Sequence, residues 1–184
     1  HFRLSLHLLM AFLILSLIYW SYLKINISRK ITNKLNIFIP LFFLILVFLQ
    51  ISIGAFVSGM DAGKIYNSWP LMGDTYFPND NNINNLFEFA ALSDPSLVQF
   101  IHRNLAYLIV IFYILIFYKI YRNKMYNLYK SINYLGMFII LQIILGIFTV
   151  LYGAQIYVAS MHQISSIFLV SSSIYFFYLN TKFN

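Results

Sequence analysis

The chain has 184 residues, of which 61% are hydrophobic and 9% are charged. Soluble domains are usually about a quarter charged, so this composition excludes an ordinary soluble domain and predicts an integral membrane protein. The chain contains no cysteine, which excludes disulfides, thiolate metal sites and iron–sulfur clusters. Its formal net charge of +7 does not indicate nucleic-acid binding, because the basic residues gather in short segments between apolar stretches.

Five apolar stretches approach or exceed the length of about 20 residues that a bilayer-spanning helix needs. We therefore predict an all-α membrane protein with five transmembrane helices, the last four of which form a bundle over residues 36–184. Residues 1–35 are expected to hold one further helix and a loop. The five predicted helices cover residues 4–23, 36–58, 97–118, 133–152 and 156–179.

The charges predict the orientation of these helices. The segments 24–35 and 119–132 are rich in lysine and arginine, whereas all five acidic residues lie between Asp61 and Asp94. Basic loops face the cytoplasm or matrix, so loops 24–35 and 119–132 are expected inside and the long loop 59–96 outside. The basic residues of the two inner loops are Lys24, Arg29, Lys30, Lys34, Lys119, Arg122, Lys124 and Lys130.

The chain contains a repeat. The second helix ends with LQISIGAFVSG and the fourth with LQIILGIFTVLYG, which place Gln50 one turn before Gly54 and Gln142 one turn before Gly146. A glycine allows close helix packing, and an amide beside it could bond across the interface. We interpret residues 36–184 as a four-helix bundle with pseudo-twofold symmetry. A chance match within a restricted amino-acid alphabet is the alternative.

Three histidines share one depth in the predicted topology. His7, His102 and His162 each lie three to six residues into a helix that runs from outside to inside. At about 1.5 Å per residue, all three fall within roughly 5 to 9 Å of the outer boundary. The residue one turn further along the same helical face is small in each case, which leaves a flat slot beside each imidazole. These small residues are Ala11, Ala106 and Ser166.

A porphyrin fits such a slot, with His102 and His162 as axial ligands to its iron and its propionates near the outer water. Arg103 could then pair with a propionate, or it could be an ordinary interfacial side chain. Histidines within a membrane also act as hydrogen-bonded core residues or proton relays. A zinc site is disfavoured, because two histidines without a carboxylate or thiolate leave the tetrahedron incomplete. For His7, a partner histidine is missing from the chain.

The outer loop 59–96 is long enough to suggest either a functional loop or disorder. Within it we interpret NDNNINN, residues 79–85, as a flexible spacer, and we predict a short interfacial helix capped by an Asn over residues 84–94. Asp61, Asp74 and Glu88 could bind a propionate through water or carry protons, although solvated side chains are the simpler interpretation.

Four segments of the chain together resemble haem A synthase, a membrane enzyme of the cytochrome oxidase assembly family. The resemblance covers nearly the whole chain and matches the C-terminal portion of that family. It implies that residues 4–23 are the fourth of eight helices and residues 36–184 the second four-helix half. The segments are GAFVSGMDAGKIYNSWPLMGD, VQFIHRNLAY, LQIILGIFTVLYGA and ASMHQISS.

The resemblance implies a function and its site residues. It implies that His102 and His162 hold a haem b that serves electron transfer, and that His7 belongs to the half where the substrate haem O binds. The implied reaction is an oxidation of the C8 methyl group of haem O to the formyl group of haem A, with oxygen from water. Haem A synthase is therefore the expected oxidoreductase activity of the complete protein.

The chain departs from the family pattern by lacking the first three helices, and with them a glutamate in the first outer loop. We expect the 184 residues to bind haem but not to turn over haem O. The alternative function is a non-catalytic bis-histidine cytochrome b electron carrier, and a transporter with histidine proton relays would bind no haem. The expected location is a bacterial or mitochondrial inner membrane. Haem O synthase and a second copy of the chain are the expected contacts, and no electron acceptor is indicated.

Overall fold

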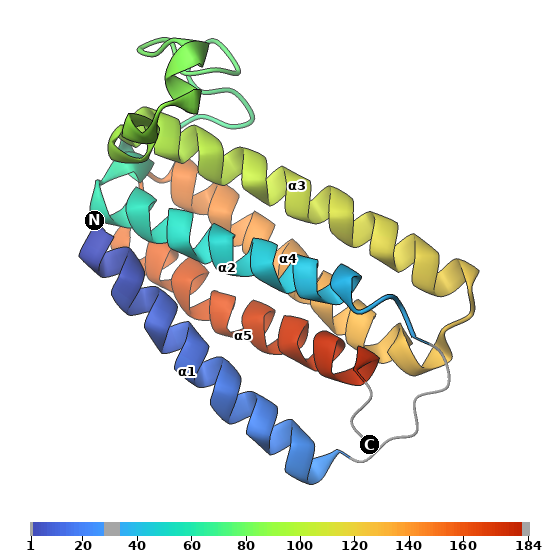
Figure 1. Ribbon diagram of the computed structural model, residues 1–184. Helices are drawn as coiled ribbons and strands as arrows, with labels where there is room; N and C mark the ends of the chain where they lie inside the picture. The colour runs from blue at the N-terminus through green and yellow to red at the C-terminus, as the bar shows by residue number, and fades with distance from the viewer. Residues whose placement is uncertain (1, 28–33, 182–184) are drawn as a thin grey trace.

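The computed structural model describes residues 2–27 and 34–181, and over these residues the chain is helical, with no strand beyond one isolated bridge between Met72 and Thr75. Five long helices lie roughly alongside one another (Figure 1). Three short 3-10 helices (η) lie in the outer loop. The long helices are α1 (Phe2–Asn26), α2 (Phe38–Gly59), α3 (Pro95–Arg122), α4 (Tyr126–Leu151) and α5 (Ile156–Asn180), and the short ones are η1 (Ala62–Lys64), η2 (Ile83–Phe87) and η3 (Phe89–Ser93).

The predicted helices are confirmed as helices, but one predicted loop boundary is wrong. Helix α4 begins at Tyr126, seven residues before the predicted start, so the segment 119–132 is mostly helical and α3 and α4 are joined by a tight turn at residues 123–125. The early turns of α4 are held by Leu128 and Ile132, both fully buried. Polar neighbours on the other face dilute the average hydropathy there, although one buried face is enough to stabilise a helix.

Four of the five helices, α1 to α4, are long and apolar enough to cross a membrane by length and composition. Helix α5 is as long as α1 but carries six serines, His162 and Gln163. Several of these serines are buried and donate hydrogen bonds to carbonyls one turn earlier, for example Ser172 and Ser173 to Leu169. Because protein rather than lipid surrounds these hydroxyls, a polar composition does not conflict with the position of α5 in the bundle. Its crossing of the membrane stays a prediction.

Helix α5 lies near the centre of the arrangement. It packs most extensively against its chain neighbour α4 and also contacts α2 and α1, while α2 packs against α1 and α3 (Figure 1). Fully buried side chains from different helices meet in one core, among them Phe43 of α2, Leu135 of α4 and Phe176 of α5. Helix α1 is therefore packed onto the following four helices. The proposed division at residue 35 stays a prediction.

At the end of the bundle where α5 ends, the helices are joined by hydrogen bonds as well as by packing. The Asn180 side chain accepts a bond from the backbone N–H of Leu35 at 2.8 Å and donates to its carbonyl at 3.1 Å. The Tyr178 hydroxyl donates to the carbonyl of Ile27 at 2.8 Å, and Trp20 of α1 meets the Tyr178 ring edge-on. These contacts fix the last turn of α5 against the segments that flank the inner loop.

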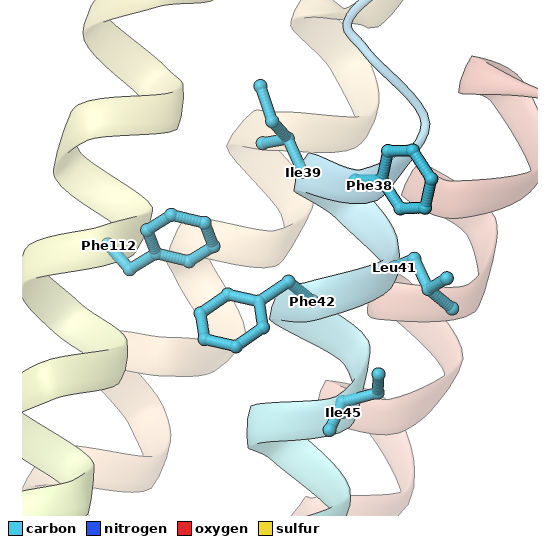
Figure 2. A pocket seen from close by; sticks show the side chains of 6 residues that line it. All are labelled: Phe38, Ile39, Leu41, Phe42, Ile45 and Phe112. Carbon is cyan, nitrogen blue, oxygen red and sulfur yellow. The ribbon is translucent and has the colours of Figure 1, made fainter.

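An open groove on the surface of α2 and α3 is entirely apolar. Figure 2 shows Phe42 of α2 and Phe112 of α3 facing one another in it, with ring centroids 5.3 Å apart in an edge-to-face arrangement. The groove starts at Phe38, the first residue of α2, and so lies at the end of α2 remote from Gly54. Its lining offers no polar group for chemistry, and the candidate site lies at the other end.

Candidate functional site

The first part of the site is formed by the helical hairpin of α2 and α3. His102 lies two turns into α3, and the Cε1 edge of its imidazole packs against Gly54 near the end of α2. A Cβ atom at Gly54 would lie 3.0 Å from His102 Cε1 and 3.6 Å from Nδ1. Any side chain at position 54 would therefore displace the imidazole. The glycine is required for the close approach of this ring.

The hairpin of α4 and α5 repeats this contact. His162 lies in the second turn of α5 and packs against Gly146 of α4, where a Cβ atom would lie 3.2 Å from His162 Cε1 and 3.7 Å from Nδ1. Both glycines thus face the same edge of a histidine ring at nearly the same distance. The two hairpins position their histidines by one kind of helix contact.

A glutamine accompanies each glycine. Gln50, one turn before Gly54, donates from Nε2 to the backbone carbonyl of His102 at 3.1 Å. Gln142, one turn before Gly146, donates to the backbone carbonyl of His162 at 3.2 Å. The cross-helix amide bond that we predicted from the sequence is present in both hairpins. Each histidine is thereby tied to the preceding helix through its ring and through its main chain.

His102 and His162 occupy equivalent positions in the two hairpins. In each ring the Nδ1 atom is buried and has no hydrogen-bond partner among the described residues. These residues bring no group of three or more His, Asp or Glu side chains together. Two imidazoles complete the coordination of a metal whose other ligands come with it, as the iron of a porphyrin does. The glycine slots and the partly buried imidazoles thus fit a haem.

Arg103, next to His102, is directed away from the imidazoles and toward the outer loop. One terminal nitrogen donates to the carbonyls of Ser68 at 2.9 Å and Leu71 at 3.2 Å, and the other donates to the carbonyl of Tyr66 at 2.9 Å. The residue is 8% exposed, and its Nε is buried with no hydrogen-bond partner in the described part of the chain. Arg103 therefore anchors the loop to α3, a role that the sequence did not suggest. Its contact with a propionate stays a prediction.

Further side chains of α3 hold the same stretch of loop. Gln99, one turn before Arg103 and also buried, donates to the carbonyl of Tyr66 at 3.0 Å. One turn after Arg103, the Tyr107 hydroxyl accepts a bond from the Trp69 indole at 3.1 Å. Three successive turns of α3 thus bind residues 66–71, which places this part of the loop beside the outer turns that carry His102.

The loop also touches the second hairpin. The Asn67 side chain donates to the carbonyl of Val150 in α4 at 3.0 Å and to that of Gly63 in η1 at the same distance. A Cβ atom at Gly63 would lie 3.1 Å from Ala154 Cβ, in the turn between α4 and α5. The loop therefore connects the outer ends of both hairpins.

Residues 79–94 are more ordered than the sequence indicated. The interpretation of residues 79–85 as a flexible spacer is wrong, because the Asn82 side chain caps η2 and Asn81 donates to Asp94 at 3.2 Å. The predicted Asn-capped helix is present as two short 3-10 helices, η2 and η3. Closely spaced asparagines read as disorder by composition, but they also form local side-chain to backbone bonds that stabilise tight turns.

Asp80 ties this part of the loop to the start of α3. It accepts hydrogen bonds from the Tyr66 hydroxyl at 2.9 Å and from the Ser96 hydroxyl. Burial raises the pKa of Asp80, but the bonds from Ser96 and Tyr66 outweigh it and hold that pKa below the ordinary value. Burial and the bond to Asp80 raise the pKa of the Tyr66 phenol. Both directions favour the ionised carboxylate accepting from a protonated phenol.

The other acidic residues show no contact with the histidines. Asp61 pairs with Lys64 at 2.7 Å in an exposed ion pair, and Glu88 is exposed between η2 and η3. Asp74 is exposed in the loop as well. These positions agree with the simpler interpretation of solvated side chains.

His7 lies on an exposed face of α1, and the structure does not bring it to the other two histidines by any described contact. Its height is set by Ser5, which is buried and donates to the carbonyl of Ser52 in α2 at 3.0 Å. Ser52 is two residues before Gly54, the glycine that faces His102. The turn that carries His7 thus starts level with the histidine slot, and its role in substrate binding stays a prediction.

Comparison with known proteins places the chain in a family. The model of the family described as cytochrome oxidase assembly protein matches residues 1–174. Proteins named Heme A synthase are similar to it: that of Pelagibacter ubique is 45% identical over 99% of this chain and 54% of its own length, and that of Rickettsia felis is 36% identical over 97% and 54%. One from Rickettsia bellii is 38% identical over 93% and 52%.

The chain spans about half the length of these curated relatives. No solved structure matches it. The family match covers nearly the whole chain and includes both hairpins, both histidines and the loop between α2 and α3. The chain therefore belongs to the cytochrome oxidase assembly protein family, together with proteins named Heme A synthase.

Proposed function

We propose that the protein to which this chain belongs is a haem A synthase, which oxidises the C8 methyl group of haem O to a formyl group with oxygen from water. We further propose that His102 and His162 are the axial ligands of a resident haem b. The observation that carries the proposal is the matched pair of partly buried imidazoles, each packed against a glycine of the preceding helix. Family membership supports the reaction.

When bound, haem b would supply a one-electron redox centre with both axial positions filled. This chain's residues would then hold that group rather than transform the substrate. Gly54 and Gly146 admit the two imidazoles, and Arg103 and Gln99 fasten the loop over the outer turns of α3. Such a closed arrangement favours passing electrons from haem O oxidation over binding oxygen or substrate at the iron.

We propose the topology that the charges predict. The turn between α3 and α4 lies inside, and the loop between α2 and α3 and the turn between α4 and α5 lie outside, with all five helices crossing the inner membrane. The basic residues of the inner turn, such as Arg122 and Lys124, and the acidic outer loop support this orientation. His102 and His162 then lie near the outer surface.

The test of the site is the optical spectrum of the purified full-length protein. We expect a low-spin b-type signal in the reduced-minus-oxidised spectrum. We expect His102→Ala or His162→Ala to abolish it or convert it to high spin, because each replacement removes one iron ligand. Gln155→Ala, in the exposed outer turn, serves as the control. A spectrum that neither histidine variant alters would refute the ligand assignment.

The test of the reaction uses cells that lack their own haem A synthase. Supplying the full-length gene should restore haem A to the extracted haem pool, whereas the His102→Ala gene should not. Protein that accumulates with a normal b-type spectrum but without any haem A would instead indicate the electron carrier.

A further inference from the structure

Gln50 and Gln142 make the same unusual bond in the two hairpins. Each donates its amide N–H to the backbone carbonyl of the histidine on the following helix, at 3.1 Å to His102 and 3.2 Å to His162. In a helix that carbonyl also accepts the N–H four residues later, so it takes a second donor from the neighbouring helix. The bond controls how far the histidine helix can slide or rotate relative to its partner.

The contact of Gln50 extends to the His102 ring. Its Nε2 lies 3.2 Å from His102 Nε2 as well as 3.1 Å from the carbonyl. A carbonyl only accepts hydrogen bonds, so the amide nitrogen, and not the amide oxygen, must face it. The ring nitrogen next to that N–H must then be the acceptor. The proton of the neutral imidazole is consequently on Nδ1, and the lone pair is on Nε2.

This tautomer is the one that a histidine needs to bind a metal through Nε2. His102 Nδ1 is buried against Gly54 and has no hydrogen-bond partner among the described residues. At metal sites a protein acceptor usually binds the other ring N–H of the histidine and so selects the tautomer. No described residue does this at Nδ1 of His102. Selection falls to Gln50, which acts at Nε2 itself.

In the second hairpin, the equivalent glutamine makes a different second contact. Gln142 makes a second contact with the Ser165 hydroxyl, and Ser165 donates to the carbonyl of His162 at 2.9 Å. The three groups form a closed triangle around the main chain of His162. The second contact of Gln142 is therefore with a serine hydroxyl, whereas that of Gln50 is with the His102 ring.

We propose that Gln50 and Gln142 are positioning residues for the two histidines, and that Gln50 also selects the His102 tautomer whose Nε2 lone pair faces the metal. The proposal rests on the proposed haem-binding function. On haem binding Gln50 gives up its contact with Nε2 and keeps its bond to the carbonyl. The two histidines are therefore held by the same kind of main-chain hydrogen bond, but only the ring of His102 is contacted by its glutamine.

The experiment compares full-length Gln50→Leu and Gln142→Leu with Gln163→Leu. Gln163 is an exposed glutamine beside His162 and provides the matched control. We expect haem titration of the haem-free protein to show about 10- to 100-fold weaker binding for the first two variants, as found for groups that orient metal ligands. Their low-spin ferric electron paramagnetic resonance signal should also shift, since it reports the orientation of the imidazole planes. Gln163→Leu should change neither property.

The tautomer is tested without haem. Nitrogen NMR of histidine-labelled haem-free protein, with His102 assigned by its loss in His102→Ala, should show the Nδ1–H form in the parent. Gln50→Leu should convert it to a mixture, and Gln142→Leu should leave it unchanged. A parent His102 in the Nε2–H form overturns the tautomer assignment.

A second pair of variants covers the event that Gln142→Leu does not fold. Ser165→Ala opens the triangle around His162 and should shift the resonance signal, whereas Ser172→Ala, whose hydroxyl donates to the Leu169 carbonyl, should not. For the first hairpin, Gln50→Met is the substitute if Gln50→Leu does not fold, because it removes the amide and keeps the length of the side chain.

Affinity and resonance signals equal to the parent in the Gln50 and Gln142 variants would overturn the positioning role. If those signals are instead insensitive to His102→Ala and His162→Ala, the haem assignment itself fails. A signal that depends on the histidines but is unchanged in the glutamine variants refutes only the positioning role of Gln50 and Gln142.

Discussion

Arg103 is a charged residue in the third turn of α3, and its hydrogen-bond partners are carbonyls of the loop between α2 and α3. Because it donates to Tyr66, Ser68 and Leu71, it compensates three backbone acceptors with one side chain. Lysine carries the same charge, but its single nitrogen lacks the planar fork that reaches both sides of the loop. The requirement at position 103 is thus for geometry as well as charge.

We expect Arg103→Leu to release the loop from α3. A hydrogen bond to a charged group contributes about 1.5–3 kcal/mol, so residues 66–71 should lose about 2 kcal/mol of local stability, or about 30-fold in amide exchange rate. Hydrogen exchange measured by mass spectrometry checks this. The exchange rate of the loop in Arg103→Lys should lie between those of the parent and Arg103→Leu. Arg122→Leu, at the far end of α3, should leave the exchange of the loop unchanged. Equal exchange in Arg103→Leu and the parent would contradict the anchoring role.

Asp80 makes the loop sensitive to acid. Its pKa is lowered below 3.8 in the folded protein, so the ionised form stabilises the fold, and that stabilisation is lost as the pH falls through the lowered pKa. We expect pepsin cleavage within residues 59–94 to accelerate as the pH drops below about 3.8. Asp80→Asn should remove the acceleration, while Asp74→Asn should retain it. A parent loop whose cleavage ignores pH in this range would refute the linkage.

At the scale of elements, α5 shows how packing changes what a helix can contain. No long window of α5 reaches the hydropathy of the other four helices, yet four of its six serines donate hydrogen bonds to its own carbonyls. Helices α2 and α4 have higher hydropathy than α1 and α3, although each carries a glutamine. A hydropathy average treats every residue as facing lipid, and for a central helix that assumption is wrong.

We expect α5 to cross the membrane from outside to inside. In a bacterial host, alkaline phosphatase fused after Gln155 should be active, because the turn between α4 and α5 lies outside. A fluorescent protein that matures only in the cytoplasm should fluoresce when it is fused after Thr181. Fusion after Asn123, in the turn between α3 and α4, gives the inner-side control. Phosphatase activity after Thr181 would show that α5 returns to the outer side.

The whole molecule consists of two hairpins, an additional helix and a loop that joins their outer ends. Each hairpin orients its own histidine through a glycine and a glutamine. The relative position of the hairpins is set by the core around α5 and by Asn67, which reaches from the loop to α4. A group bound between the imidazoles would therefore act as a further link between units that are otherwise held by packing.

We expect haem to stabilise the full-length protein. A ligand that binds only the folded state adds about 2.7 kcal/mol at a free concentration 100 times its dissociation constant, so the loaded protein should unfold at a higher temperature than the haem-free protein. In His102→Ala and His162→Ala this difference should disappear, because neither holds the iron from both sides. Thermal unfolding followed by circular dichroism measures it, and a difference that survives in both variants would contradict the link.

The sequence by itself determined the helical class, most of the helices to within a few residues, and the glycine and glutamine that accompany two of the histidines. These properties depend on local apolar length and on spacing along one helix, which the chain order contains directly. Only the tertiary structure decided the partners of Arg103, the ordered course of the outer loop and the early start of α4. Each of these depends on groups far apart in the chain, whose carbonyls or buried faces become neighbours only when the helices have packed.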